Sequence, residues 1–377
     1  MRGRDLALIA SDMPASVAGV FTRSSVVGAP VEVTRARVRA GRARGVIVNS
    51  GVANVALGAR GVRDAERMAE MAARALGCDA REFLVASTGV IGKPLPLARL
   101  RAGVPAAVRA LRADGLRDAA HAIMTTDTRP KLASARVRIR GRDVSIVGIA
   151  KGSGMIEPQL ATMLAFVLTD AALVPACARR FLRTAAEASF NRLSVDGETS
   201  TSDMLLLLAN GAAGHAPLRD VTGRAAARFQ SALTAVCAEL ARAVARDGEG
   251  ATKLVTVRVC GARSRGEAER AARRIANSLL VKTALFGADP NWGRILQTVG
   301  AGRVAVDLTR AEVRLAGVAV YRRGRALGEA ARLRARRRLA RREIEIAVDL
   351  AAGRAEFWVW TCDLSYDYVR INAEYTS

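Results

Sequence analysis

The sequence KGSGMIEPQLATML, residues 151–164, places one lysine and a glycine-rich turn ahead of an Ala-Thr pair and an apolar run. A lysine beside glycines suggests a phosphate-binding loop, but here the lysine comes first, so the GxxxxGK[ST] order is absent. One interpretation is therefore a tight turn that leads into a buried strand over 163–168.

A second interpretation concerns the peptide bond between Ala161 and Thr162. If that bond breaks, Thr162 becomes an N-terminal residue. Its α-amine, with a pKa of about 7.7–8, then serves as a general base beside its own hydroxyl. This chemistry needs no histidine, and the chain has only two, His121 and His215. The small Ala161 and the upstream glycines permit the strained geometry of such a cleavage.

Composition limits the class of protein. The 377 residues, half of them hydrophobic, are enough for one large or two ordinary domains. The five cysteines contain no CxxC pair and predict reduced thiols, while two histidines exclude a histidine-rich metal site and argue against a Ser-His-Asp triad. The longest apolar segment, 160–168, is too short to span a membrane. These features predict a soluble cytoplasmic enzyme without a histidine-rich metal site.

The net charge of +24 raises the alternative of a basic nucleic-acid-binding protein. All but five of the 59 basic residues are arginine, which is typical of a drift in codon usage. Aromatic residues make up only 4%, so few side chains can stack on bases. The densest basic run, 332–342, fits a solvated helix face. We therefore expect no nucleic-acid partner.

Periodicity predicts a mixed α and β fold. Residues 46–48 and 83–85 have the pattern of buried strands, and 63–76 that of a helix ended by Gly77. The clearest helix is predicted over 224–246. Residues 343–350 and 356–361 are interpreted as a β-hairpin. No internal repeat or flexible linker is evident.

The stretch 151–164 resembles the cleavage-site motif of the ornithine acetyltransferases, also called glutamate N-acetyltransferases. The resemblance continues along nearly the whole chain, through DLALI at 5–9, PASVAGVF at 14–21 and DGEGATK at 247–253. DGETSTSD at 196–203 and DPNWGR at 289–294 also match and are interpreted as loops that line or support the site. One departure is Val52, which stands where the family's NSGNAN segment has an asparagine.

The lysines add a separate observation. Each lies in a segment that matches the family, and a compact ammonium is not interchangeable with a planar guanidinium at a tight site. Retention of lysine in so arginine-rich a chain therefore indicates constrained positions. These lysines are Lys93, Lys131, Lys151, Lys253 and Lys282.

The resemblance implies roles for individual residues. Thr162 would be the nucleophile, released by cleavage after Ala161, and Thr88 with Gly89 would form the oxyanion hole. An α-carboxylate could pair with Lys151, and an ammonium with Glu249. The implied substrate-binding residues are Thr125, Lys151, Thr162, Glu249, Asn372 and Ser377.

The resemblance also implies a layered α-β-β-α architecture with a C-terminal α/β part. Cleavage would give fragments 1–161 and 162–377, which stay associated and pair into a heterotetramer. The implied reaction is ping-pong transfer of acetyl from N²-acetyl-L-ornithine to L-glutamate in arginine biosynthesis, without a cofactor, with acetyl-CoA as a possible second donor. The alternative is a related self-cleaving aminopeptidase, which would pass the acyl group to water.

Overall fold

A computed structural model describes residues 5–157 and 163–374, so Ala161, Thr162 and Ser377 lie outside the described residues. The described chain forms two compact units. Unit 1 comprises 5–157, 163–191 and 199–244, and unit 2 comprises 192–198 and 245–374. Both units combine helices with a mixed β-sheet, which confirms the predicted mixed α/β class.

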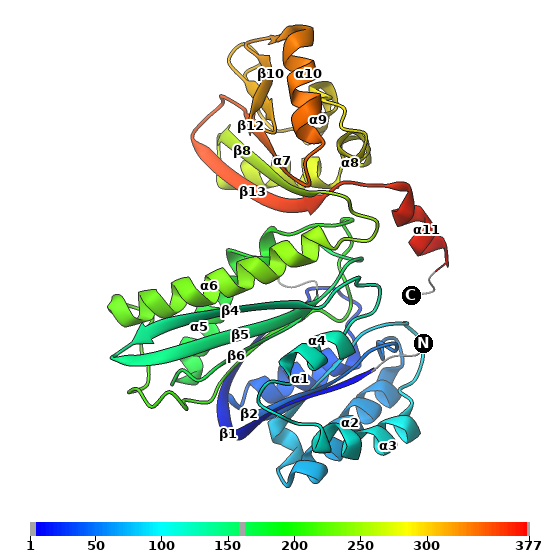
Figure 1. The fold of residues 1–377 in the computed structure, drawn as a ribbon, viewed down its shortest axis with the longest axis vertical. Coiled ribbons are helices and arrows are strands. Elements are labelled where there is room, and N and C mark those ends of the chain that lie inside the picture. Colours follow the sequence, from blue (N-terminus) through cyan, green and yellow to red (C-terminus); the bar gives the residue numbers. More distant parts are fainter. Residues whose placement is uncertain (1–4, 158–162, 375–377) are drawn as a thin grey trace. The chain divides into compact units, whose positions relative to one another are not determined.

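Unit 1 contains a seven-stranded sheet in the order β3-β2-β1-β7-β6-β5-β4 (Figure 1). Its strands are β1 (Leu6–Phe21), β2 (Arg42–Asn49), β3 (Phe83–Ser87), β4 (Lys131–Ile139), β5 (Arg142–Lys151), β6 (Leu164–Thr169) and β7 (Met204–Ala209). Its helices are α1 (Ala29–Val38), α2 (Gly58–Leu76), α3 (Leu97–Arg109), α4 (Leu116–Ala122), α5 (Pro175–Glu187) and α6 (Gly223–Arg246).

The long strand β1 belongs to both halves of this sheet. Its first part pairs with β2, and its last part, Ser16–Phe21, pairs with β7. The register to β2 shifts between Ala10 and Ala15, where extra residues bulge and bend the strand. As a result, the half formed by β1, β2 and β3 folds over the half formed by β4 to β7.

The two halves enclose one hydrophobic core. Val46 and Leu84 from one half share it with Phe166 and Leu206 from the other. Outside the first half, Met68 of α2 packs in a separate cluster with strand side chains of β2 and β3. Outside the second half, α6 lies close to β5, and α5 contacts β1 and β7. This arrangement confirms the predicted α-β-β-α layering within unit 1.

Unit 2 contains a six-stranded sheet in the order β11-β10-β9-β12-β8-β13. Its strands are β8 (Leu254–Ala262), β9 (Glu312–Leu315), β10 (Val318–Arg322), β11 (Arg325–Ala326), β12 (Glu343–Asp349) and β13 (Ala355–Cys362). Its helices are α7 (Arg265–Asn277), α8 (Leu279–Phe286), α9 (Trp292–Ala301), α10 (Gly328–Leu339) and α11 (Tyr366–Glu374).

Most elements predicted from periodicity form as expected. Strands β2 and β3 contain 46–48 and 83–85 and pair in parallel, and α6 covers the helix predicted over 224–246. Helix α2 begins five residues before the predicted start and ends where Gly77 adopts a left-handed φ of 67°.

The predicted hairpin over 343–361 is wrong. Strand β8 lies between β12 and β13, pairing in parallel with β12 and antiparallel with β13. Alternation of apolar and charged residues reports that a strand has one buried face, but it does not identify the neighbouring strand. Here the buried residues of β8 join those of β12 and β13 in one hydrophobic core.

Among the described residues, no helix is long and apolar enough to cross a membrane.

Candidate active site

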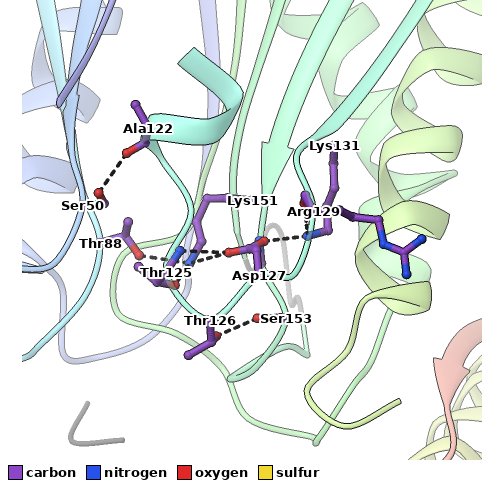
Figure 2. Close-up of polar contacts among 11 residues, drawn as sticks. Ser50, Thr88, Ala122, Thr125, Thr126, Asp127, Arg129, Lys131, Lys151 and Ser153 are labelled. Atoms are coloured by element: carbon purple, nitrogen blue, oxygen red, sulfur yellow. Dashed lines mark hydrogen bonds and ion pairs between the residues drawn. The ribbon is translucent and has the colours of Figure 1, made fainter. Parts of the chain in front are cut away.

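Lys151 is the centre of a polar cluster that includes Thr88, Thr125 and Asp127 (Figure 2). It is the last residue of β5, and its ammonium donates to Thr125 Oγ1 at 2.7 Å and to Thr88 Oγ1 at 3.2 Å. Thr88 directly follows β3, in the opposite half of the sheet, and Thr125 lies between α4 and β4. The fold thus unites three residues that the sequence analysis assigned to the site.

Asp127 is a buried carboxylate beside two lysines, and the sequence analysis gave it no role. Its Oδ1 accepts from Lys131 Nζ at 2.6 Å and from the Gly152 N–H at 2.7 Å. Its Oδ2 accepts from the Thr125 N–H at 3.1 Å and lies 3.9 Å from Lys151 Nζ. Burial alone would raise the pKa of Asp127, but the two ammonium groups and the Gly152 N–H outweigh it and lower that pKa to about 2. Asp127 is therefore ionised at neutral pH.

Thr88 and Gly89 lie against the turn at 49–54. The Thr88 N–H donates to Asn49 O at 3.1 Å, and the Val90 N–H donates to Gly51 O at 3.2 Å. Gly89 has a φ of 127°, and a Cβ there would come within 2.3 Å of the Gly51 carbonyl carbon. The turn therefore requires glycine at this position. A backbone held this firmly suits an oxyanion-stabilising donor.

Val52, where the sequence analysis expected the family's asparagine, belongs to this turn. Its carbonyl oxygen accepts from Asn49 Nδ2 at 2.9 Å, and its side chain packs against the cluster of α2, β2 and β3. The Asn49 Oδ1 in turn accepts from Ser87 Oγ at 2.5 Å, at the end of β3. Asn49 therefore joins Val52 to Ser87, the residue before Thr88.

Asp203 is a second buried acid that the sequence analysis placed only within a supporting loop. It directly precedes β7, and the next residue, Met204, donates its N–H to Met163 O at 2.8 Å. Burial raises the pKa of Asp203 well above its usual range, despite the opposing effects of Ser200 and Lys151. Its Oδ2 has no hydrogen-bond partner in the described part of the chain. Burial thus favours the protonated form of Asp203, whereas the neighbouring ammonium groups favour the ionised form of Asp127.

Glu249 and Asn372 belong to unit 2, where they contact each other. Asn372 Nδ2, on α11, donates to Glu249 Oε2 at 2.7 Å and to Tyr368 O at 3.0 Å. Glu249 is buried, whereas Asn372 is exposed. The structure thus joins these two predicted substrate-binding residues to each other. It assigns them to a different unit from Thr88, Thr125 and Lys151.

Four of the five lysines are buried, as expected for ammonium groups in tight sites. Lys131, Lys151, Lys253 and Lys282 have at most 9% of their surface exposed. Lys93 is exposed, so its retention has no comparable explanation. The scarcity of lysine in the sequence thus indicated that Lys131 is a constrained position, and the structure shows that Lys131 pairs with Asp127.

Within 5–157 and 163–374, no three His, Cys, Asp or Glu side chains are grouped to hold a metal ion.

Comparisons with known proteins give one consistent result. The ArgJ family matches residues 1–377. A protein of Symbiobacterium thermophilum named arginine biosynthesis bifunctional protein ArgJ is 50% identical over 375 residues, covering 99% of this chain and 92% of its own. The protein of the same name from Geobacter sulfurreducens is 48% identical over 371 residues, covering 98% and 94%. The crystal structure of an ArgJ protein from Bacillus halodurans is 39% identical with a TM-score of 0.53, covering 56% of this chain and 98% of its own.

Proposed function

This chain belongs to the ArgJ family, and we propose that it transfers acetyl from N²-acetyl-L-ornithine to L-glutamate through an acetyl-Thr162 intermediate. Family membership makes it an acyltransferase of arginine biosynthesis. The specific donor, acceptor and covalent intermediate are our proposal. It depends most on the buried ammonium of Lys151, held between Thr88 and Thr125.

The position of Lys151 along the chain supports this proposal. Lys151 lies opposite Leu164 where β5 pairs with β6. Leu164 is only two residues after Thr162 in the sequence. A substrate carboxylate bound by Lys151 would thus lie beside the strand residue that follows the proposed nucleophile by two positions.

In the proposed cleavage, Thr162 Oγ attacks the Ala161 carbonyl carbon. The Ala161–Thr162 C–N bond breaks, the nitrogen takes a proton, and an ester forms. Water then hydrolyses the ester, which leaves a carboxylate on Ala161 and a free α-amine on Thr162.

In the proposed transfer, the Thr162 α-amine accepts the hydroxyl proton while Oγ attacks the acetyl carbonyl carbon. The oxyanion would be stabilised by Thr88 and Gly89. Thr88 Oγ1 accepts from Lys151, which leaves its own hydroxyl proton for donation. Collapse expels ornithine with a proton on its amine, and the amine of glutamate then attacks acetyl-Thr162 to regenerate the hydroxyl.

The first test is a denaturing gel combined with an acyl-transfer assay. We expect wild-type protein to give two fragments and to release more than one equivalent of ornithine per enzyme from N²-acetylornithine only when glutamate is supplied. Thr162→Ala should give one full-length band without transfer, while Thr162→Ser should still be cut. Normal processing of Thr162→Ala would contradict the choice of nucleophile. Continued turnover of N²-acetylornithine without glutamate would favour the aminopeptidase-like hydrolase.

We also propose that fragments 1–161 and 162–377 assemble as a cytoplasmic heterotetramer of two copies each. No resident cofactor or nucleic-acid partner is proposed, although acetyl-CoA could serve as a second acetyl donor. Light scattering coupled to size exclusion should give the mass of two full chains, and mass spectrometry should detect both fragments. N-acetylglutamate formed from acetyl-CoA and glutamate alone would establish the second activity.

A further inference from the structure

The loop over 247–253, in unit 2, is joined to the residues that lead into α11. Asp363 lies between β13 and α11, and its Oδ1 accepts from the N–H groups of Thr252 at 2.8 Å and Lys253 at 2.9 Å. Its Oδ2 accepts from the Thr252 hydroxyl. Asp363 is buried. Hydrogen bonds to one buried carboxylate therefore fix the loop against the start of the helix.

Gly250 makes the closest contact between this loop and α11. Its carbonyl oxygen accepts from Ser365 Oγ at 2.5 Å. Gly250 has a φ of 68°, and a Cβ there would come within 2.5 Å of Tyr368 N and 3.0 Å of the Asp367 carbonyl carbon. Both are backbone atoms of the first turn of α11, which cannot move aside as a flexible side chain can. The helix therefore packs in this position only against a glycine.

This packing brings the far end of α11 to Glu249. Asn372 Nδ2 donates to Glu249 Oε2 at 2.7 Å and to Tyr368 O at 3.0 Å. Glu249 is buried, so the directions from which a ligand can reach its carboxylate are few. An amide donor is uncharged, so Asn372 orients this carboxylate without forming an ion pair with it.

We propose that Gly250 and Ser365 seat α11 so that Asn372 holds the Glu249 carboxylate in the orientation that binds the side-chain ammonium of the acetyl donor. A charge-assisted hydrogen bond depends on direction as well as on distance. The seating of α11 thus contributes to specificity for a donor that ends in an ammonium. Gly250 and Ser365 act through Asn372 and Glu249, so both are positioning residues. The inference rests on the proposed transfer from N²-acetylornithine.

Two glycines of unit 2 provide a matched pair of variants. Gly250→Ala places a methyl group against the backbone of α11 and should displace the helix. Gly328 has a similar φ of 77°, but a Cβ there would meet no atom within 4 Å. Gly328→Ala therefore introduces the same left-handed alanine without the contact. The difference between the two variants isolates the seating of α11 from backbone strain.

Ser365 provides a second, milder pair. Ser365→Ala removes the hydrogen bond to the Gly250 carbonyl oxygen, whereas Ser365→Thr keeps a hydroxyl that can donate to it. Neither variant places a new atom beside Gly250 Cα.

The measurement is the ratio of kcat/KM for N²-acetyl-L-ornithine to that for N²-acetyl-L-norvaline, with glutamate as acceptor. The norvaline derivative has the same side chain without the ammonium, so wild-type protein should prefer the ornithine derivative. We expect Gly250→Ala to lower the ratio by about tenfold, mainly through a higher KM for N²-acetylornithine, and Ser365→Ala to lower it by about threefold. Gly328→Ala and Ser365→Thr should stay within about twofold of the wild-type ratio.

Equal ratios in Gly250→Ala and Gly328→Ala would overturn the inference. So would an equal loss of activity toward both donors in Gly250→Ala, because a purely structural role predicts that result. If Gly250→Ala does not fold, as judged by circular dichroism, the Ser365 pair decides. A ratio that falls in Ser365→Ala but not in Ser365→Thr supports the inference, and equal ratios overturn it.

The wild-type protein separates this inference from the proposed function. If it transfers acetyl from neither donor, the proposed function fails, and the inference fails with it. If it prefers N²-acetylornithine and no variant moves the ratio, only the inference about α11 fails.

Discussion

The two units both bury lysine side chains, but they do so in different surroundings. In unit 1, Lys131 and Lys151 lie beside a carboxylate and two threonine hydroxyls. In unit 2, Lys253 donates to the carbonyl oxygens of Leu285 and Phe286, the last residues of α8. Lys282 donates to the Thr361 hydroxyl and to the Cys362 carbonyl oxygen at the end of β13.

This difference separates two uses of a buried charge. Backbone carbonyls at a helix C-terminus complement an ammonium electrostatically and join two elements of the fold. Burial lowers the pKa of Lys253, which reflects the energetic penalty of such a position. An ammonium that donates to threonine hydroxyls, as Lys151 does, can also pair with the carboxylate of a ligand. We therefore interpret Lys253 and Lys282 as structural and Lys151 as substrate-binding.

The largest expected effect tests the functional side of this comparison. Lys151→Met removes the charge that receives the carboxylate, so kcat/KM for glutamate should fall by about a hundredfold. The remaining Lys131–Asp127 pair is neutral and stays internally bonded, so the folded protein should persist. Steady-state kinetics and circular dichroism measure the two properties. Full activity in this variant would contradict the assignment of Lys151.

Lys282→Met tests the structural side. It leaves the buried Cys362 carbonyl without its ammonium donor, so the free energy of unfolding should fall by about 2 kcal/mol. The KM for glutamate should not change. Urea unfolding and the same kinetic assay provide both values. A raised KM for glutamate with an unchanged free energy of unfolding would contradict the interpretation of Lys282 as structural.

Asp203→Asn sharpens the contrast between the two buried acids of unit 1. Because the folded-state pKa of Asp203 is raised, the folded protein keeps a proton that the unfolded chain releases above about pH 4. Stability should therefore fall with rising pH by up to about 1.4 kcal/mol per pH unit until the raised pKa is passed. The asparagine variant should lack this component. Identical pH profiles for wild type and variant would show that Asp203 ionises normally.

Arg332→Lys should have the smallest effect. Arg332 is exposed on α10 and pairs with Glu329 across 3.3 Å, so the free energy of unfolding should change by less than about 0.5 kcal/mol. Lys131→Arg is the matched opposite exchange, at a site with 1% exposure, and should destabilise by about 1–3 kcal/mol. Thermal unfolding compares the two. If both substitutions changed the free energy of unfolding equally little, the retention of lysine would no longer indicate constrained positions.

Local pattern was enough to predict much of the molecule. The helical spacing of apolar residues located α2 and α6, and alternation located the strands, because both patterns depend only on near neighbours in sequence. Motifs located Thr88, Thr125 and Lys151, and the scarcity of lysine pointed to Lys131. The sequence by itself therefore determined the fold class, the family and most of the candidate site residues.

Only the tertiary structure decided which of these residues meet. Thr88 and Lys151 are 63 positions apart, and their contact depends on the bend in β1 that folds one half of the sheet over the other. The insertion of β8 between β12 and β13 likewise has no local signature. Asp127 and Asp203 are identical in covalent structure, yet two ammonium groups and a backbone N–H lower the pKa of Asp127, whereas burial raises the pKa of Asp203. Charge state depends on surroundings in three dimensions, which residue order does not specify.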